Sequence, residues 1–240
     1  MKGLILCILT YMYSSCCAQV KLTYKLEGGI SSSTFPRKTS KERIKSVYSP
    51  TAGFYITSEF SKRFVSDFGV QYYTQGFKEE YSSRVFDLIN RTYLTVDELE
   101  QLTFNVITIP ISFRYNFHIG NVKLNSFIGY SFVNLVSGSY YYMLQARHDI
   151  DLGKNLFIKK SINPFSKDLE IPSQRNNAQL ICGIGIQISK RVELCFKVSA
   201  GIKYVYFQEK RPPGAIWDDP SYDHRFLPND LTVTVRYYLN

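Results

Sequence analysis

The sequence lacks any run of about 18 apolar residues, which excludes a protein that crosses a membrane with helices. It also holds only three histidines and one tryptophan. Histidine is the commonest general base and metal ligand, so candidate catalytic sites are few. No Gly-x-Ser-x-Gly motif accompanies His118, His148 or His224. The sequence therefore predicts a protein that is not an enzyme and holds no cofactor.

Cysteine is scarce, and its five positions do not suggest a disulfide framework. Cys7, Cys16 and Cys17 lie in or beside an N-terminal apolar segment. Cys182 and Cys195 fall on opposite faces of the strands predicted below, where side chains cannot reach disulfide geometry. Two free thiols are expected there, while lipidation of Cys16 or Cys17 stays an alternative for the N-terminus.

The first residues have the order of a secretory signal peptide. Lys2 gives a positive start, an apolar core of about ten residues ends at Tyr13, and small residues follow up to Ala18. We expect export through the Sec pathway and cleavage after Ala18. Residues 1–18 are then the signal peptide, and 19–240 form one mature domain.

Acidic residues are outnumbered, with 20 carboxylates against 29 lysines and arginines and a formal net charge of +9. Such an excess is compatible with nucleic-acid binding. The signal segment, however, removes the chain from the cytoplasm, and the basic residues do not form one stripe. No nucleic-acid partner is expected.

Beyond the signal segment, apolar and polar residues alternate with the period of β-strands. In residues 103–117, Ile109 and Phe113 share one face, and Ser112 and Arg114 share the other. The eight segments with this pattern are Lys21–Ser33, Thr51–Ser61, Asp67–Lys78, Thr103–Phe117, Val122–Val136, Ala178–Ser189, Val192–Phe207 and Leu231–Asn240.

One face of these strands avoids charge in its central stretches, and the other face collects it. A charge facing lipid costs about 2–4 kcal/mol at the membrane midplane, so a lipid-facing surface explains the charge-free face. The fold expected is an all-β, eight-stranded antiparallel up-and-down transmembrane β-barrel in the cell outer membrane. A soluble periplasmic ligand-binding barrel with the charged face outward is an alternative.

The charged face is then expected to line the lumen. An eight-stranded barrel is just wide enough for side chains to fill it. Burying charges without partners costs several kcal/mol each, so a plug of ion pairs is favoured over a conducting pore. The expected lumen charge network comprises Lys25, Glu27, Glu59, Arg114, Lys123, Glu193, Lys197, Lys203 and Arg236.

The connections between predicted strands alternate in length, as in outer-membrane barrels with short periplasmic turns and long extracellular loops. We expect both termini in the periplasm, and loops at the cell surface that serve binding, display or assembly. Outer-membrane lipid and lipopolysaccharide are the expected partners of a monomer. Short turns are predicted at 62–66, 118–121 and 190–191, and long loops at 34–50, 79–102, 137–177 and 208–230.

The first of these loops is basic. Arginine and lysine favour phosphate oxygens, so contact with lipopolysaccharide phosphates is one interpretation, and an ordinary solvated loop is the other. The residues concerned are Arg37, Lys38, Lys41, Arg43 and Lys45.

Four segments share the pattern of a known group. They are Ala18-Gln19, Gly28-Gly29-Ile30, Ile107-Thr108-Ile109-Pro110-Ile111-Ser112-Phe113-Arg114-Tyr115 and Phe127-Ile128-Gly129-Tyr130-Ser131. Together they resemble the PorT-like outer-membrane β-barrel family of Bacteroidota. The resemblance implies no common catalytic residues, and it implies a component of a protein secretion machine as an alternative function. A lipid-modifying barrel enzyme is a further alternative.

Overall fold

The computed structural model describes residues 21–34, 43–87, 92–148, 156–167, 175–202, 205–208 and 223–239. The predicted signal peptide lies outside them. The described residues contain no helix that is long and apolar enough to cross a membrane. The strands are β1 (Lys21–Thr34), β2 (Arg43–Glu59), β3 (Phe64–Asp87), β4 (Thr92–Ile119), β5 (Val122–His148), β6 (Leu156–Ile162), β7 (Asn176–Gln187), β8 (Val192–Gly201), β9 (Val205–Gln208), β10 (Asp223–Phe226) and β11 (Asn229–Tyr238).

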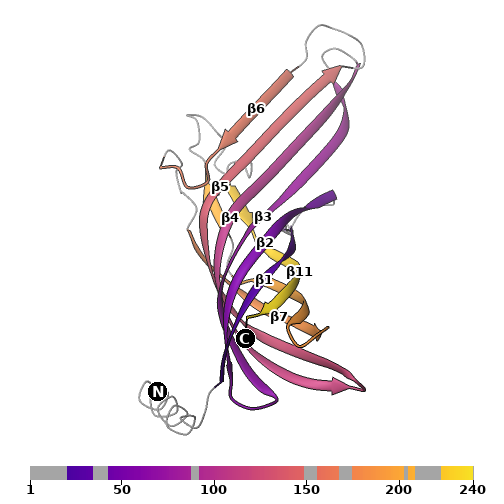
Figure 1. Cartoon of the computed structure of the whole chain (residues 1–240). Coiled ribbons are helices and arrows are strands. Elements are labelled where there is room, and N and C mark those ends of the chain that lie inside the picture. The colour runs from indigo at the N-terminus through magenta and orange to yellow at the C-terminus, as the bar shows by residue number, and fades with distance from the viewer. Residues whose placement is uncertain are drawn as a thin grey trace.

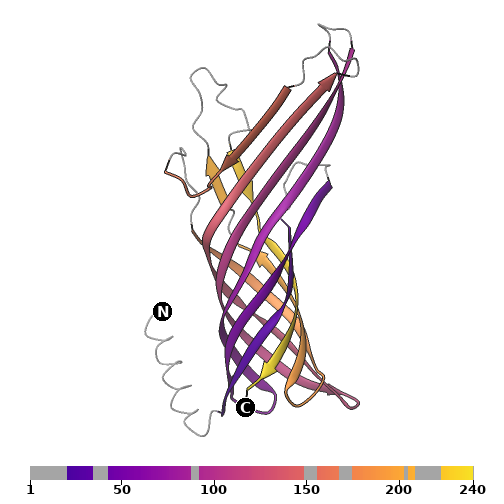
Figure 2. The ribbon, with the colours of Figure 1, turned by 45° about the horizontal axis from the view of Figure 1, so that its top comes forward.

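Eight of these strands close into a ring. Strands β1 to β5 pair antiparallel in sequence order, β5 pairs with β7, β7 with β8, and β8 with β11. The ring closes where β11 returns to β1, with Tyr237 opposite Leu26. Figure 2 shows the strands tilted around a common axis. The predicted eight-stranded antiparallel up-and-down barrel is confirmed.

One end of the ring holds the start of β1, the end of β11 and three short turns (Figure 1). The turns span residues 60–63, 120–121 and 188–191. Gly120 has a φ of 57°, a left-handed conformation that a two-residue hairpin turn requires and that glycine adopts without strain. We call this end of the ring the turn end and the opposite end the loop end.

The prediction of long loops at 79–102 and 137–177 is wrong over most of each segment. β3 and β4 continue through the first segment as a hairpin, with Asp87 opposite Thr92. β5 continues through the second as far as His148, and β6 pairs with it. β3, β4 and β5 therefore rise past the ring as part of the same sheet, with β6 at its edge (Figure 1). We call this part of the sheet, residues 78–87, 92–103, 137–148 and 156–162, the extension.

Two further boundaries differ from the sequence-based expectation. The loop predicted at 34–50 is shorter because β2 begins at Arg43, and the loop at 208–230 contains β10. The seventh predicted strand ends at Gly201, since β9 leaves the ring and pairs with β10 in a two-stranded sheet.

Alternation along the ring strands places apolar side chains outside and polar ones inside. On β4, Ile109 and Phe113 are exposed, whereas Ser112 and Arg114 are buried. Cys182 is exposed on the outside and Cys195 is buried inside, both as free thiols, as the alternation predicted. The interior polarity is the reverse of that of a soluble barrel.

The lumen becomes apolar toward the loop end, which the sequence-based prediction of a charged lining did not include. Its side chains belong to β3, β4, β5 and β9, so the short β9 strand contributes to closing this end. The buried cluster comprises Phe77, Leu102, Phe104, Val106, Val133, Leu135, Tyr140 and Val205.

Candidate functional site

The centre of the lumen is an ion-pair network built from inward positions of the ring strands. Asp67 of β3 accepts from Lys25 of β1 at 3.1 Å and is also paired with Arg114 of β4. Arg114 Nη1 lies 2.7 Å from Glu193 Oε2 of β8. Tyr238 of β11 donates to the same carboxylate. Strands far apart in sequence are thereby joined across the interior.

Arg236 of β11 occupies the neighbouring level of the lumen. Its Nε lies 2.5 Å from Glu27 Oε2, and its Nη1 lies 3.6 Å from both Asp67 and Glu193. The guanidinium also stacks over Tyr55, with 4.9 Å to the ring centroid. Such planar contacts suit arginine rather than lysine.

The network is balanced in charge, which makes its burial tolerable. Lys25, Arg114 and Arg236 face the three carboxylates of Glu27, Asp67 and Glu193, and all six are almost fully buried. Removing one partner from such a set leaves a buried charge without compensation, at a cost of about 3–5 kcal/mol. The arrangement therefore favours a lumen filled by mutually paired side chains.

A second polar layer lies nearer the loop end. The Asp230 carboxylate accepts from Gln75 at 2.5 Å, from Gln179 at 2.9 Å and from Tyr73 at 3.2 Å. Lys197 donates to Gln71, whose own amide donates to Glu27 at 3.0 Å. Hydrogen bonds thus extend the ion-pair network as far as Lys197, and the Asp230 group and the apolar cluster lie beyond it.

The structure brings together six of the nine residues predicted for the lumen network. Glu59 is half-buried and Lys123 exposed, both at the turn end, and Lys203 lies outside the described residues. The six inside are Lys25, Glu27, Arg114, Glu193, Lys197 and Arg236.

Asp67 and Asp230 are the lumen carboxylates that the sequence analysis missed. Asp67 lies at the edge of a predicted strand, but it shares the parity of the inward residues Gln71 and Tyr73. Parity alone is therefore the signal that finds it. Asp230 was assigned to a loop, so no parity was available for it.

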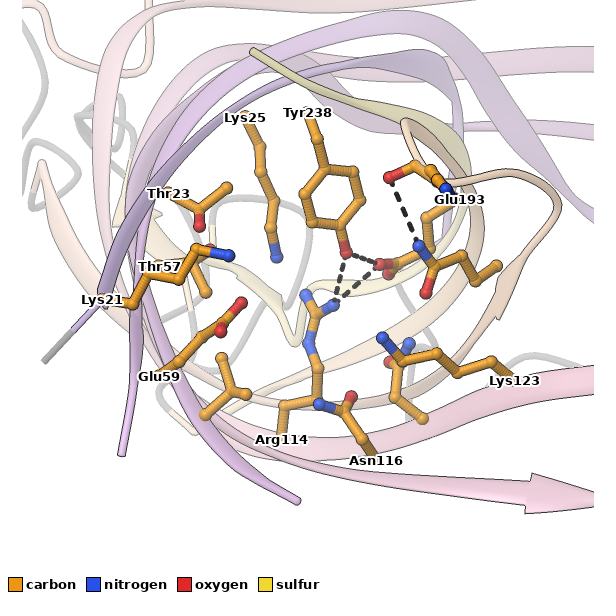
Figure 3. Close-up of a pocket in the computed structure, with 14 residues that line it drawn as sticks. Lys21, Thr23, Lys25, Thr57, Glu59, Arg114, Asn116, Lys123, Glu193 and Tyr238 are labelled. Carbon is orange, nitrogen blue, oxygen red and sulfur yellow. Dashed lines mark hydrogen bonds and ion pairs between the residues drawn. The ribbon is translucent and has the colours of Figure 1, made fainter. Parts of the chain in front are cut away.

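The turn end of the lumen is hollowed into a pocket of about 350 Å³, which we call the turn-end pocket. Figure 3 shows Lys21 and Lys123 on opposite walls of the pocket. Arg114, Glu193 and Tyr238 are hydrogen-bonded to one another. Its lining residues are Lys21, Thr23, Lys25, Thr57, Glu59, Val65, Arg114, Asn116, Lys123, Asn125, Gln187, Lys190, Glu193 and Tyr238.

The extension and the adjoining start of β2 carry ion pairs of a different kind, exposed on the outward face. Lys45 and Lys78 both pair with Glu80, the latter at 2.8 Å. Their hydrogen bonds lower the pKa of Glu80 to about 2. The Ser82 hydroxyl and then Arg147 likewise lower the pKa of Asp97. These carboxylates stay charged in mildly acidic solution.

The residues predicted to contact lipopolysaccharide are only partly visible. Arg37, Lys38 and Lys41 lie outside the described residues, as does the side chain of Arg43. Lys45 is exposed and paired with Glu80.

The described part of the chain offers little for metal or histidine chemistry. It contains no group of three or more His, Cys, Asp and Glu side chains arranged to hold a metal ion. His118 lies exposed at the end of β4, beside a turn. The side chains of His148 and His224 are not among those described.

No protein-family model and no curated protein matches the chain. Among solved structures, outer membrane protein OprG from Pseudomonas aeruginosa is similar, at 10% identity and a TM-score of 0.41, over 92% of this chain and 98% of OprG. The attachment invasion locus protein Ail of Yersinia pestis gives 9% and 0.37, over 90% and 98%. Neisserial surface protein A gives 10% and 0.33, over 90% and 96%.

Proposed function

We propose that this chain is a non-enzymatic outer-membrane β-barrel, closed by side chains, that presents the extension at the cell surface as a binding surface. The observation that carries the proposal is the inverted polarity of the ring. Buried arginines and carboxylates fill the inside, while large apolar side chains cover the outside. Lipid is the solvent that stabilises such an exterior.

The height of the apolar exterior matches a bilayer. Along β4, the outward residues from Ile107 to Ile119 are all apolar or aromatic. Thirteen residues of tilted strand rise about 30–35 Å, close to the hydrocarbon thickness of about 30 Å. The ring strands are therefore long enough to span the membrane.

A belt of hydrogen-bonded polar side chains ends this apolar surface toward the loop end. Asn105 of β4 bonds Thr74 of β3 at 3.0 Å and Ser137 of β5 at 2.9 Å. Thr103 and Ser139 bond each other at 2.8 Å one position further along. Satisfied polar groups suit the level where strands leave hydrocarbon for headgroups and water. We call Thr74, Asn105, Ser137, Thr103 and Ser139 the polar belt.

The extension then stands outside the bilayer. Outer-membrane barrels keep short turns in the periplasm and longer segments outside, so the turn end is periplasmic in this proposal. From Thr92 to Asn105, β4 continues for about 45 Å along its own direction. A rigid sheet of this length holds a binding surface clear of the membrane.

The proposals on export, family likeness and lipid partner rest mainly on the sequence. Cleavage after Ala18, Sec export and the likeness to PorT-like barrels remain predictions from motifs. Lipopolysaccharide is the proposed lipid partner, since Lys45 and Lys78 lie on the outward face beyond the polar belt and phosphate attracts ammonium groups. A monomer is the proposed state.

Cell fractionation tests the location directly. The mature chain is expected in outer membranes, extractable only with detergent, and its migration on a gel should change on boiling. Recovery as a monodisperse soluble protein without detergent would contradict the proposal.

Epitope tags test the orientation. A tag at Asn155, between β5 and β6, should bind antibody on intact cells. A matched tag at Gly120, in a turn-end hairpin, should bind only after the outer membrane is opened. The reverse pattern would place the extension in the periplasm.

A further inference from the structure

We propose that the turn-end pocket binds a small dianion, inorganic hydrogen phosphate. The pocket is formed by inward side chains of the ring strands, so this inference goes beyond the proposed function and does not depend on which compartment the turn end faces.

The first argument is charge that remains uncompensated. Lys21, Lys123 and Lys190 line the pocket, and within the described part of the chain none of their ammonium groups has an ion-pair partner. Glu59 is the pocket carboxylate outside the buried network, and it too is unpaired. Three ammonium groups and one carboxylate leave two positive charges, the complement of a dianion.

The second argument is the set of buried polar atoms that line the pocket without a hydrogen bond among the described residues. Arg114 Nε, Asn125 Oδ1 and Glu193 Oε1 form this set, and all three side chains are at least nine-tenths buried. Glu193 Oε1 lies 3.6 Å from Arg236 Nη1, so Arg114 Nε and Asn125 Oδ1 are the two atoms left for a ligand. A buried unsatisfied polar atom costs about 1–3 kcal/mol. Hydrogen phosphate answers both needs, since its oxygens accept from Arg114 Nε–H and its single P–OH donates to Asn125.

The third argument is the shape of the wall at Gly185. A Cβ at this position would lie 2.5 Å from Glu193 Oε1 and 2.6 Å from Asn125 Nδ2. Any other residue would displace these polar side chains from the wall. Glycine here keeps Asn125 and Glu193 in their places beside the pocket.

The size and position of the pocket favour a small soluble ligand. A volume of about 350 Å³ is at the lower end for small-molecule sites. The buried pairs of Lys25 and Arg114 lie on its inner side, so a ligand held there does not cross the barrel. A phospholipid headgroup outside the ring faces the opposite side of these strands.

Calorimetric titration of the purified full-length mature protein in non-ionic detergent, at low ionic strength and pH 8, tests the proposal. Inorganic phosphate should bind saturably with one site per chain, and sodium chloride at matched ionic strength should not. The double variant K21Q/K123Q is expected to weaken phosphate binding about tenfold or more, because two charges facing the dianion are lost.

Two further variants separate a built site from general electrostatics. K62Q/R63Q also removes two charges, from the exposed 60–63 turn outside the pocket, and should change affinity less than about twofold. E59Q removes the opposing carboxylate and should tighten binding severalfold.

Three results would overturn the inference. They are an absence of saturable phosphate binding, equal weakening by the two double variants, and binding of phosphatidate vesicles without binding of inorganic phosphate. None bears on fractionation or surface tagging, so this inference and the proposed function fail separately.

Discussion

The ring and the extension share strands β3, β4 and β5, yet their charged side chains lie in opposite surroundings. Those of the ring are buried in the lumen, and those of the extension are exposed. In the ring, Arg114 pairs with Asp67 where both side chains are about 2% exposed or less. In the extension, Arg147 pairs with Asp97 at 2.6 Å, and the two side chains are 53% and 33% exposed. The chemistry of the two pairs is alike, so their surroundings decide what each contributes.

The buried pair holds the fold by mutual dependence rather than by large net attraction. Removing Arg114 would leave Asp67 and Glu193 charged inside the lumen with fewer partners. Water screens the exposed pair, and such pairs contribute about 0–1 kcal/mol. Mutations matched between the two regions measure this difference.

The largest effect is expected from the matched changes R114M and R147M. R114M should lower the free energy of unfolding by about 3–5 kcal/mol, because the lumen carboxylates lose their central cation. R147M should lower it by less than about 1 kcal/mol. Urea unfolding in phospholipid vesicles, followed by gel mobility, measures both.

Equal losses of unfolding free energy in R114M and R147M would contradict the difference between buried and exposed ion pairs. A small cost for R114M would mean that water reaches the network, and the lumen would then not be filled by paired side chains.

A second matched pair probes the outward faces along β4. Phe113 lies midway along the apolar stretch, and F113K should cost about 2–4 kcal/mol in phospholipid vesicles. Gln101 lies beyond the polar belt, so Q101K should change stability by less than about 0.5 kcal/mol. A cost for Q101K as large as that for F113K would place the belt inside the membrane.

The ring was predictable because each of its strands separates two contrasting solvents. The outward surface requires apolar residues such as Phe113, and the closed lumen requires polar residues such as Arg114. Apolar and polar residues therefore alternate along the sequence with a period of two. In the proposed arrangement the extension stands outside the bilayer, so its outward side does not face lipid. Polar side chains such as Asp97 and Arg147 are tolerated there. The outward and inward residues then differ little in polarity, so the sequence of these strands resembles that of a loop.

The sequence predicted which side chains of the site point into the lumen, but not which of them pair with one another. Parity placed Arg114 and Arg236 inside, yet it carries no information on height along the barrel axis. Lys123 and Glu59 have inward parity, but they lie at the turn end and make no ion pair with the buried network among the described residues. Their separation from the network depends on strand register and tilt, which only the assembled ring determines.

The smallest expected effect concerns the exposed pair at the base of the extension. Glu80 has its pKa lowered from 4.5 to about 2, with the Lys45 hydrogen bond as the largest cause and the Lys78 hydrogen bond next. A carboxylate whose pKa falls on folding adds stability above its unfolded value, and that stability is lost as the pH drops through the folded value. The contribution of Glu80 should therefore disappear between about pH 4.5 and pH 2.

Titration of the Glu80 carboxyl by NMR measures this shift without unfolding the barrel. The midpoint should lie well below 4.5 in the unmodified protein and move back toward 4.5 in K45Q, because the strongest hydrogen-bond donor is gone. K159Q removes an equal charge from the outward face of β6, where the ammonium lies 5.6 Å from the Tyr141 ring centroid, and should leave the midpoint in place. Equal shifts in both variants would show that Glu80 responds to the net charge of the extension rather than to its own partners. The exposed pairs would then have no individual role in ordering the sheet, and the contrast with the ring would be sharper still.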